Sequence, residues 1–233
     1  MILAFETSAK AASVAILENG KLLGESYQNT GLTHSQTLLQ LAEDTLKTCG
    51  KTAADVTAVA VAAGPGSFTG VRIGVAAAKG FAWGAELPCV GVSTLEAMAE
   101  SLGIWEGTVV PTMDARRAQT YTAIFKADGG KLARLDKDQA ISYEELGNKL
   151  IFCKKPIFLV GDGAEICYNT LNEMVPGLVL PPEHHRHQRA IGVALVAEKT
   201  LATGERPHGE ALKPNYLRLS QAERERLEKQ KKE

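Results

Sequence analysis

The amino-acid sequence predicts an α/β protein built from two similar lobes. Short apolar segments alternate with amphipathic ones along the chain of 233 residues, a pattern typical of strands followed by helices. The order of three strands, a helix, a strand and a helix occurs once in each half. In both halves the first strand ends at a carboxylate, Glu6 or Asp114. We therefore expect an internal duplication with a cleft between the lobes, although many α/β chains alternate in this way by chance.

The first lobe is expected to span residues 1–105. Its first segment, residues 1–7, is a short apolar run that indicates a buried strand. Asn19 and Gly20 predict a hairpin turn, because both central positions of such a turn need a positive φ. The remaining elements are expected to be strands at 13–17, 22–27, 56–62 and 88–92, and helices at 34–48, 70–83 and 94–102.

The second lobe is expected to span residues 106–220. We predict strands at 109–113, 120–125, 132–140 and 156–160, and helices at 143–150, 164–174 and 191–203. Residues 221–233 mix both charges densely and are expected to form a charged tail.

Composition and charge restrict the class of protein. The hydrophobic content of 45% and charged content of 23% are those of a soluble globular protein. The net charge of −1 argues against a strongly nucleic-acid-binding surface, without excluding contact with RNA through a complex. The 4 cysteines form no C-x-x-C pair, so we expect reduced thiols and a cytoplasmic protein. No signal peptide or membrane-spanning segment is expected.

A glycine-rich run at residues 64–74 is the densest motif in the chain. A glycine loop that leads into a helix can bind an anion through backbone N–H groups. However, the run lacks the spacing of a P-loop, and the dinucleotide-binding pattern would need glycine where Thr69 stands. Phosphate binding is therefore the secondary interpretation of this run.

The helix that follows the glycine run is apolar on nearly all sides, since Arg72 and Lys79 are the charged residues between Gly70 and Gly84. Its small residues form a stripe that lets another helix approach closely, and such a helix must be covered. We expect a partner protein to cover it together with the preceding helix; the alternative is a helix sandwiched inside the chain. The expected interface residues are Leu38, Leu39, Leu41, Leu46, Gly70, Gly74, Ala77, Ala78 and Phe81.

The cleft between the lobes is the second candidate site. Glu6 and Asp114 could hold a metal–nucleotide complex there, with Thr7 and Ser8 beside them, or could simply accept hydrogen bonds in the turns that follow. The histidines of residues 184–187 have no second ligand cluster and follow two prolines, so we expect a loop there and no metal site. No nucleophile–base arrangement indicates a hydrolase, and no catalytic residue is predicted.

Four segments carry a resemblance to a known family: residues 2–8 (ILAFETS), 64–74 (GPGSFTGVRIG), 113–117 (MDARR) and 214–218 (PNYLR). Together they are similar to the bacterial TsaB family of tRNA threonylcarbamoyladenosine biosynthesis proteins, over essentially the whole chain. The resemblance implies the actin-like, sugar-kinase-like ATPase fold, which agrees with the duplicated pattern. In that fold, Gly161 and Gly163 would lie where the adenine of a nucleotide is contacted.

The catalytic paralogue of this family, TsaD, once described as a glycoprotease, carries a His-x-x-x-His metal pair. The matching positions here hold Thr94 and Met98, and neither side chain supplies an imidazole. The chain thus resembles a paralogue without the metal chemistry.

The resemblance implies a non-enzymatic subunit that binds TsaD and acts with the ATPase TsaE in transferring threonylcarbamoyl from its adenylate to the adenosine beside the anticodon. It implies contact with tRNA through the complex, a homodimer when the chain is alone, and no cofactor of its own, while ATP or ADP binding within the complex stays open. The alternatives are an ATP-dependent small-molecule kinase and a glycoprotease-like metalloprotease.

Overall fold

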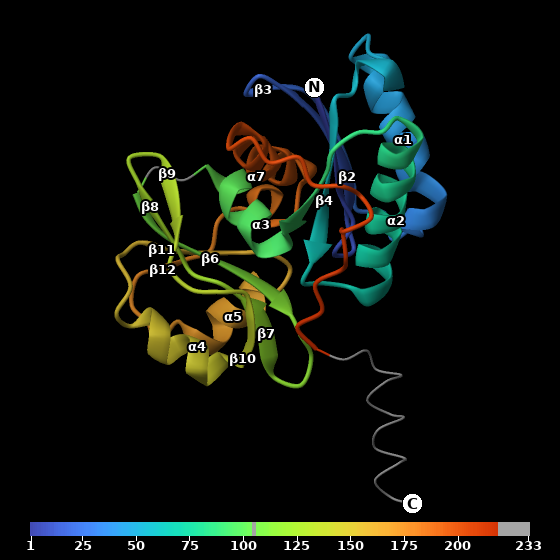
Figure 1. The fold of residues 1–233 in the computed structure, drawn as a ribbon. Helices are drawn as coiled ribbons and strands as arrows, with labels where there is room; N and C mark the ends of the chain where they lie inside the picture. The colour runs from blue at the N-terminus through green and yellow to red at the C-terminus, as the bar shows by residue number, and fades with distance from the viewer. Residues whose placement is uncertain (104–105, 219–233) are drawn as a thin grey trace, which may run out of the picture.

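The computed structural model describes residues 1–103 and 106–218, which form two β-sheets with helices between and outside them (Figure 1). The first half contains β1 (Ile2–Glu6), β2 (Ala12–Glu18), β3 (Lys21–Gln28), α1 (His34–Thr48), the 3-10 helix η1 (Ala53–Asp55), β4 (Ala58–Gly64), α2 (Phe68–Gly84), β5 (Cys89–Ser93) and α3 (Thr94–Leu102). The second half contains β6 (Glu106–Asp114), β7 (Gln119–Thr122), β8 (Phe125–Asp128), β9 (Lys131–Arg134), β10 (Gln139–Ser142), α4 (Tyr143–Leu150), β11 (Ile157–Val160), α5 (Ala164–Leu171), β12 (Leu178–Val179), α6 (Glu183–Arg186) and α7 (Ala190–Ala202).

The two sheets have the same topology, which confirms the predicted duplication. The strand order is β3-β2-β1-β4-β5 in the first sheet and β10-β7-β6-β11-β12 along the main path of the second. In each sheet the first strand of the lobe is central: β1 is antiparallel to β2 and parallel to β4, and β6 is antiparallel to β7 and parallel to β11. Glu6 and Asp114 therefore end equivalent central strands.

Most predicted elements form close to their expected bounds, and the hairpin turn has Asn19 at φ 51° and Gly20 at φ 74°. The strands predicted at 120–125 and 132–140 are wrong as continuous elements. Each is broken, and β8 and β9 form a separate hairpin beside β6. The break at Ala123 and Ile124 lies in an unbroken run of buried residues, so the apolar pattern did not locate it. The helix predicted at 164–174 ends at Leu171, and the expected loop at residues 184–187 is mostly the short helix α6.

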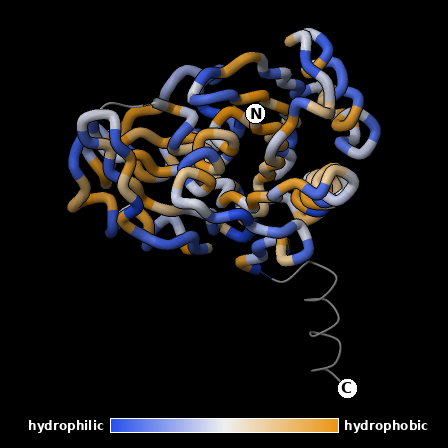
Figure 2. The backbone as a smooth tube through the Cα atoms, turned by 45° about the horizontal axis from the view of Figure 1, so that its top comes forward, coloured by the Kyte–Doolittle hydropathy of each residue, from blue (hydrophilic) through white to orange (hydrophobic). Residues whose placement is uncertain are grey.

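Hydrophobic clusters separate the molecule into layers. Helices α1 and α2 cover the outer face of the first sheet, α3 and α7 lie between the sheets, and α4 and α5 cover the outer face of the second (Figure 1). Apolar stretches of the backbone run through the interior, and hydrophilic ones follow the surface loops (Figure 2). Burial of apolar side chains on both faces of each sheet is what holds this arrangement together.

Helices α3 and α7 hold the two sheets together. Leu95 and Met98 of α3 pack into the core of the second sheet, whereas Ala97 packs with α7 against the first. At Gly192 of α7 a Cβ atom would overlap the carbonyl oxygen of Ala97, so only glycine permits this approach. A boundary at 105/106 therefore separates the sheets but not the helices: α7, from the second half, packs on the first sheet.

A strap, defined as residues 205–218, returns across the first lobe after α7 (Figure 1). Cys89 N–H donates to Pro207 O at 2.9 Å, and Asn215 N–H donates to Ala63 O at 2.6 Å. Tyr216 stacks on Phe68 of α2 with ring centroids 4.7 Å apart. The strap covers the edge strand β5, which limits pairing of that edge with other chains.

The charged tail predicted at 221–233 lies outside the described residues. Over the ranges that the structure does describe, no helix has both the length and the apolar character needed to cross a bilayer.

Candidate functional site

The glycine run that follows β4 packs against the rest of the chain. Gly64 and Gly66 have φ values of 112° and 156°, and a Cβ at Gly66 would lie 2.5 Å from the carbonyl oxygen of Ser8. The next residue, Ser67, donates its N–H to the same Ser8 oxygen at 2.7 Å, and its hydroxyl accepts from Gly70 N–H at the start of α2. The glycines thus serve close backbone approach within the molecule.

The small-residue stripe of α2 faces the chain's own sheet. Gly70, Gly74 and Ala78 are buried, and a side chain at Gly70 or Gly74 would overlap Thr7 at the end of β1. The expectation that these three residues contact a partner is wrong in this structure, because the sheet occupies the space in front of them. Leu38, Leu41 and Leu46 of α1 are likewise buried in the cluster beneath both helices. On this side of α2, the alternative prediction of a helix packed inside the chain fits the structure.

The opposite side of α2 is open and mostly apolar, with the exposed Arg72 one turn before Ala76. Ala76, Gly80 and Trp83 are exposed, and the Trp83 side chain is 85% exposed. No atom lies within 4 Å of the position that a Cβ at Gly80 would take. Of the expected interface residues, Ala77 and Phe81 are partly buried at the margin of this side, and Leu39 of α1 is 61% exposed. We call this set of exposed and partly buried residues the α2 outer face; it comprises Ile73, Ala76, Ala77, Gly80, Phe81, Trp83 and Gly84.

The carboxylates that end β1 and β6 close the same turn in both lobes. Ser8 N–H donates to Glu6 Oε1 at 2.6 Å, and Arg116 N–H donates to Asp114 Oδ1 at 2.7 Å. Of the two roles that the sequence allowed for these carboxylates, a metal–nucleotide site or hydrogen bonds in the following turns, these bonds are the second. Thr7, which was expected to line the cleft, instead donates its hydroxyl to Gly70 O at 2.8 Å beneath α2.

Glu6 is buried without a full set of partners. No atom of the described residues donates to its Oε2, and the hydroxyl of Ser8 is also buried and unpartnered. Burial raises the pKa of Glu6 to about 7, and the nearby Asp162 carboxylate raises it further, against the lowering effect of the hydrogen bond from Ser8 N–H. Glu6 is therefore close to half protonated near neutral pH.

Asp162 follows β11 and is close enough to Glu6 for its carboxylate to raise the pKa of Glu6. Gln188 donates its amide to Asp162 Oδ1 at 3.0 Å, while burial raises the pKa of Asp162. The sequence pattern did not indicate Gln188, since it lies between lobes in a connection without periodicity. A polar cavity of about 250 Å³ opens beside this pair, lined by Gly161, Asp162, Glu165, Glu183, Arg186 and His187.

The predicted cleft glycines pack closely on β6. A Cβ at Gly161, whose φ is 101°, would overlap Thr112 O, and one at Gly163 would lie 3.1 Å from Asp114 N. Gly161 lines the polar cavity, whereas Glu6, Thr7 and Ser8 are buried and are not among its lining residues. Among the described residues, no three histidine, cysteine, aspartate or glutamate side chains are grouped so as to hold a metal ion.

Thr94 and Met98 lie on one side of α3. Both are buried, Met98 belongs to the apolar cluster against the second sheet, and the Thr94 hydroxyl has no partner among the described residues. A thioether in an apolar cluster is a poor ligand for a hard or borderline cation. These positions fill the core.

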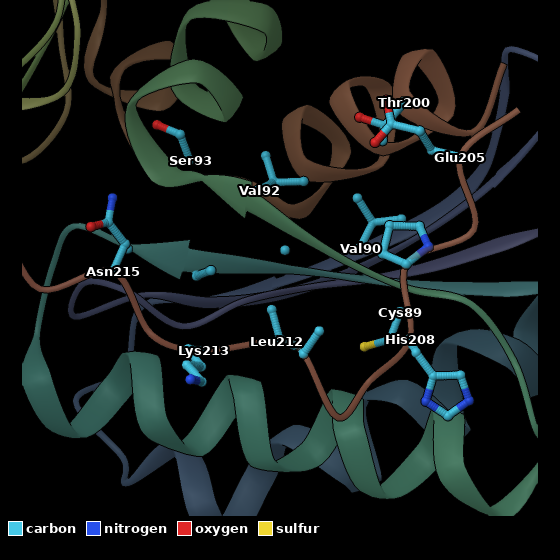
Figure 3. A pocket seen from close by; sticks show the side chains of 15 residues that line it. Cys89, Val90, Val92, Ser93, Thr200, Glu205, His208, Leu212, Lys213 and Asn215 are labelled. Atoms are coloured by element: carbon cyan, nitrogen blue, oxygen red, sulfur yellow. The ribbon is translucent and has the colours of Figure 1, made fainter. Parts of the chain in front are cut away.

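A second cavity, of about 420 Å³, lies between β5 and the strap (Figure 3). Val90 and Val92 point toward α7, whereas Cys89 and Leu212 lie on the side of α2 (Figure 3). A side chain at Gly91 would overlap Leu212, so glycine at this position allows the strap to pack on β5. No sequence motif indicated this cavity, because residues 205–213 have no regular pattern.

Comparison with known proteins gives consistent results for the whole chain. The family model described as TsaD, tRNA N6-adenosine threonylcarbamoyltransferase, matches residues 28–226. The tRNA threonylcarbamoyladenosine biosynthesis protein TsaB of Bacillus subtilis is 31% identical over 232 residues, which are 99% of each chain. The protein of the same name from Escherichia coli is 38% identical over 149 residues, 62% of this chain and 63% of its own.

Solved structures agree with these matches. YeaZ from Pseudomonas aeruginosa superposes with a TM-score of 0.78 at 27% identity, covering 93% of this chain and 99% of that one. Component A of (R)-2-hydroxyglutaryl-CoA dehydratase from Acidaminococcus fermentans shares the fold alone, with a TM-score of 0.52 at 14% identity over 86% of this chain and 98% of that one. The fold is the actin-like, sugar-kinase-like ATPase fold with two duplicated lobes.

Proposed function

The chain belongs to the TsaB family of tRNA threonylcarbamoyladenosine biosynthesis proteins, and from this premise we propose that it is the non-catalytic subunit that binds and supports TsaD. Together with TsaE, the two subunits transfer threonylcarbamoyl from its adenylate to the N6 of the adenosine beside the anticodon. The observation that carries the proposal is the burial of Thr94 and Met98 in the core at the positions where the catalytic paralogue holds its metal.

The α2 outer face supports a role in protein association. An exposed glycine inside a helix costs about 1 kcal/mol relative to alanine, and Gly80 lies inside α2 where an added Cβ would meet no other part of the described chain. Close approach of a second helix explains its place, and Trp83 beside it is the type of residue that anchors interfaces. We propose that TsaD covers this face, with Leu39 of α1 at its margin.

When TsaD is absent, the same face is expected to pair with a second copy of the chain, because a contiguous apolar patch seeks cover and a two-fold arrangement makes it self-complementary. Light scattering of the isolated chain tests this: a dimer that dissociates when TsaD is added is the expected result.

Reconstitution of tRNA modification tests the function. TsaD, TsaE, the threonylcarbamoyl-adenylate and an unmodified tRNA transcript are combined with and without this chain, and the modified nucleoside is measured. We expect modification only when the chain is present, and no turnover by the chain alone. Undiminished modification without it would remove the proposed role. ATP consumption by the isolated chain with a polyol or acid would favour the kinase alternative instead.

A further inference from the structure

The turn between β6 and β7 presents two arginines on an uncommon backbone. Arg116, Arg117 and Ala118 have consecutive φ values of 64°, 57° and 55°. The left-handed region costs an L-residue about 1–2 kcal/mol, and it is normally visited by single residues. Strain of this size persists where the surroundings impose it, and such sites are often functional.

Several hydrogen bonds impose this conformation. Asp114 Oδ1 accepts from Arg116 N–H, Ala115 N–H donates to Gln119 O at 3.0 Å, and Gln119 N–H donates to Arg116 O at 3.2 Å. From the end of the strap, the Arg218 guanidinium donates to the carbonyl oxygens of Ala115 and Arg116. The turn is thus fixed from inside its own hairpin and from a segment about one hundred residues away in the chain.

This construction concentrates positive charge. Arg116 and Arg117 lie in the turn and Arg218 donates to its carbonyl oxygens, while the Asp114 carboxylate lies 3.7 Å from the Arg116 guanidinium. The Arg116 side chain is 85% exposed, and Arg117 is exposed with no carboxylate at ion-pair distance among the described residues. By contrast, Arg134 pairs with Glu96 and Asp138. The turn is therefore locally basic, although the net charge of the whole chain is −1.

We propose that this turn binds the phosphodiester backbone of the tRNA substrate through Arg116 and Arg117. Guanidinium groups match phosphate oxygens in two-pronged hydrogen bonds, and a rigid turn loses little entropy when it makes them. Neither arginine lines a cavity among those found in the described residues, so an outward-facing strand of RNA fits better than a bound nucleotide. The inference rests on the proposed function, which brings tRNA to the complex.

The double variant R116G/R117G separates the charge from the backbone, because glycine adopts positive φ without strain. We measure binding of an unmodified tRNA transcript to the full chain at several salt concentrations, together with the thermal unfolding midpoint. The expected result is about tenfold weaker binding at low salt and a slope of log K against log salt that is smaller by about two, roughly one per phosphate contact. The unfolding midpoint should equal or exceed that of the unmodified chain.

The matched control is K131A/K137A, which removes two exposed cations elsewhere on the second lobe and should leave tRNA binding unchanged. R116K/R117K should retain most of the binding. Unchanged affinity and slope in R116G/R117G would overturn the proposal, as would loss of TsaD or ATP binding with tRNA affinity intact. Binding of tRNA to the isolated chain is measured separately from reconstituted modification. A failed reconstitution would contradict the proposed function, whereas the binding measurement alone tests the Arg116–Arg117 site.

Discussion

The side chain of Thr7 fills the space into which a side chain at Gly74 would project, so that a Cβ at Gly74 would overlap Thr7 Oγ1 and lie 3.2 Å from Val61 Cγ2. The same hydroxyl donates to Gly70 O one turn earlier on α2. Helix α2 therefore lies directly on β1 and β4 along its small-residue stripe. Of the two sides of α2, the α2 outer face is the one that the chain's own sheet leaves open.

Substitution of Gly74 is expected to destabilise the fold. Gly74→Ala should lower the free energy of unfolding by about 1–3 kcal/mol, because the added methyl group overpacks the contact with Thr7. Gly80→Ala is the matched control on the same helix, where open space lies in front of the Cβ, and should raise the free energy of unfolding by about 0.5–1 kcal/mol. Urea denaturation measures both. Equal effects of the two variants would contradict the packing described for α2.

Substitution of Trp83 tests the proposed interface. Trp83→Glu should reduce co-purification with TsaD at least tenfold, because it replaces a large exposed aromatic side chain of the proposed apolar contact with a charge. Circular dichroism should remain unchanged, since the side chain is exposed. Phe152→Glu, at an aromatic residue of the second lobe that is 88% exposed, should leave co-purification as it is. A loss of binding in the Phe152 variant alone would contradict the proposal, because it would place the interface on the second lobe.

Glu6 should make stability depend on pH. Its pKa is raised to about 7 by burial, from an ordinary value of 4.5, so the folded state binds the extra proton between these values. Stability contributed by the protonated form is present below pH 4.5 and is lost as the pH rises through 7, by about 3 kcal/mol in total. Glu6→Gln, which cannot ionise, should therefore be more stable than the unmodified chain at pH 8 and little different at pH 5.

Urea titrations at pH 5 and pH 8 check this dependence. A Glu6→Gln variant with the same pH profile as the unmodified chain would show that Glu6 does not titrate in this window. Neither Glu6→Gln nor Glu6→Ala should alter co-purification with TsaD, since Glu6 lies in the cleft and away from the α2 outer face. Loss of co-purification would show that cleft and interface are not separate.

The contact between α3 and α7 should control the docking of the lobes. Gly192→Ala places a methyl group on Ala97 O, so the helices must move apart and both sheets lose packing. We expect a loss of about 2–3 kcal/mol in the free energy of unfolding, in the upper part of the range for overpacked contacts. Gly204→Ser, where no atom lies within 4 Å of the added Cβ, tests a glycine of positive φ without overlap and should cost about 1 kcal/mol. A smaller loss in Gly192→Ala than in Gly204→Ser would contradict the close helix contact.

The element order can be predicted from the sequence because apolar residues repeat at different spacings in strands and in helices. The helices at 34–48, 94–102 and 143–150 were located from this signal alone, and they form with those bounds. The strands β7 and β8 were merged, because buried residues run through the break between them and alternation disappears there. Gln188, whose amide contacts Asp162, lies in a segment without a local pattern.

The sequence by itself determined the duplicated α/β order, the family and the absence of imidazoles at positions 94 and 98, since each is a property of residue types at fixed spacing. Only the tertiary structure decided which side of α2 is open, because a small-residue stripe lets a sheet approach as well as a partner helix. It also decided that Arg116, Arg117 and Arg218 meet at one turn, since the strap brings the last of them across both lobes. Contacts between distant segments depend on how layers stack, and that information is spread over the whole chain.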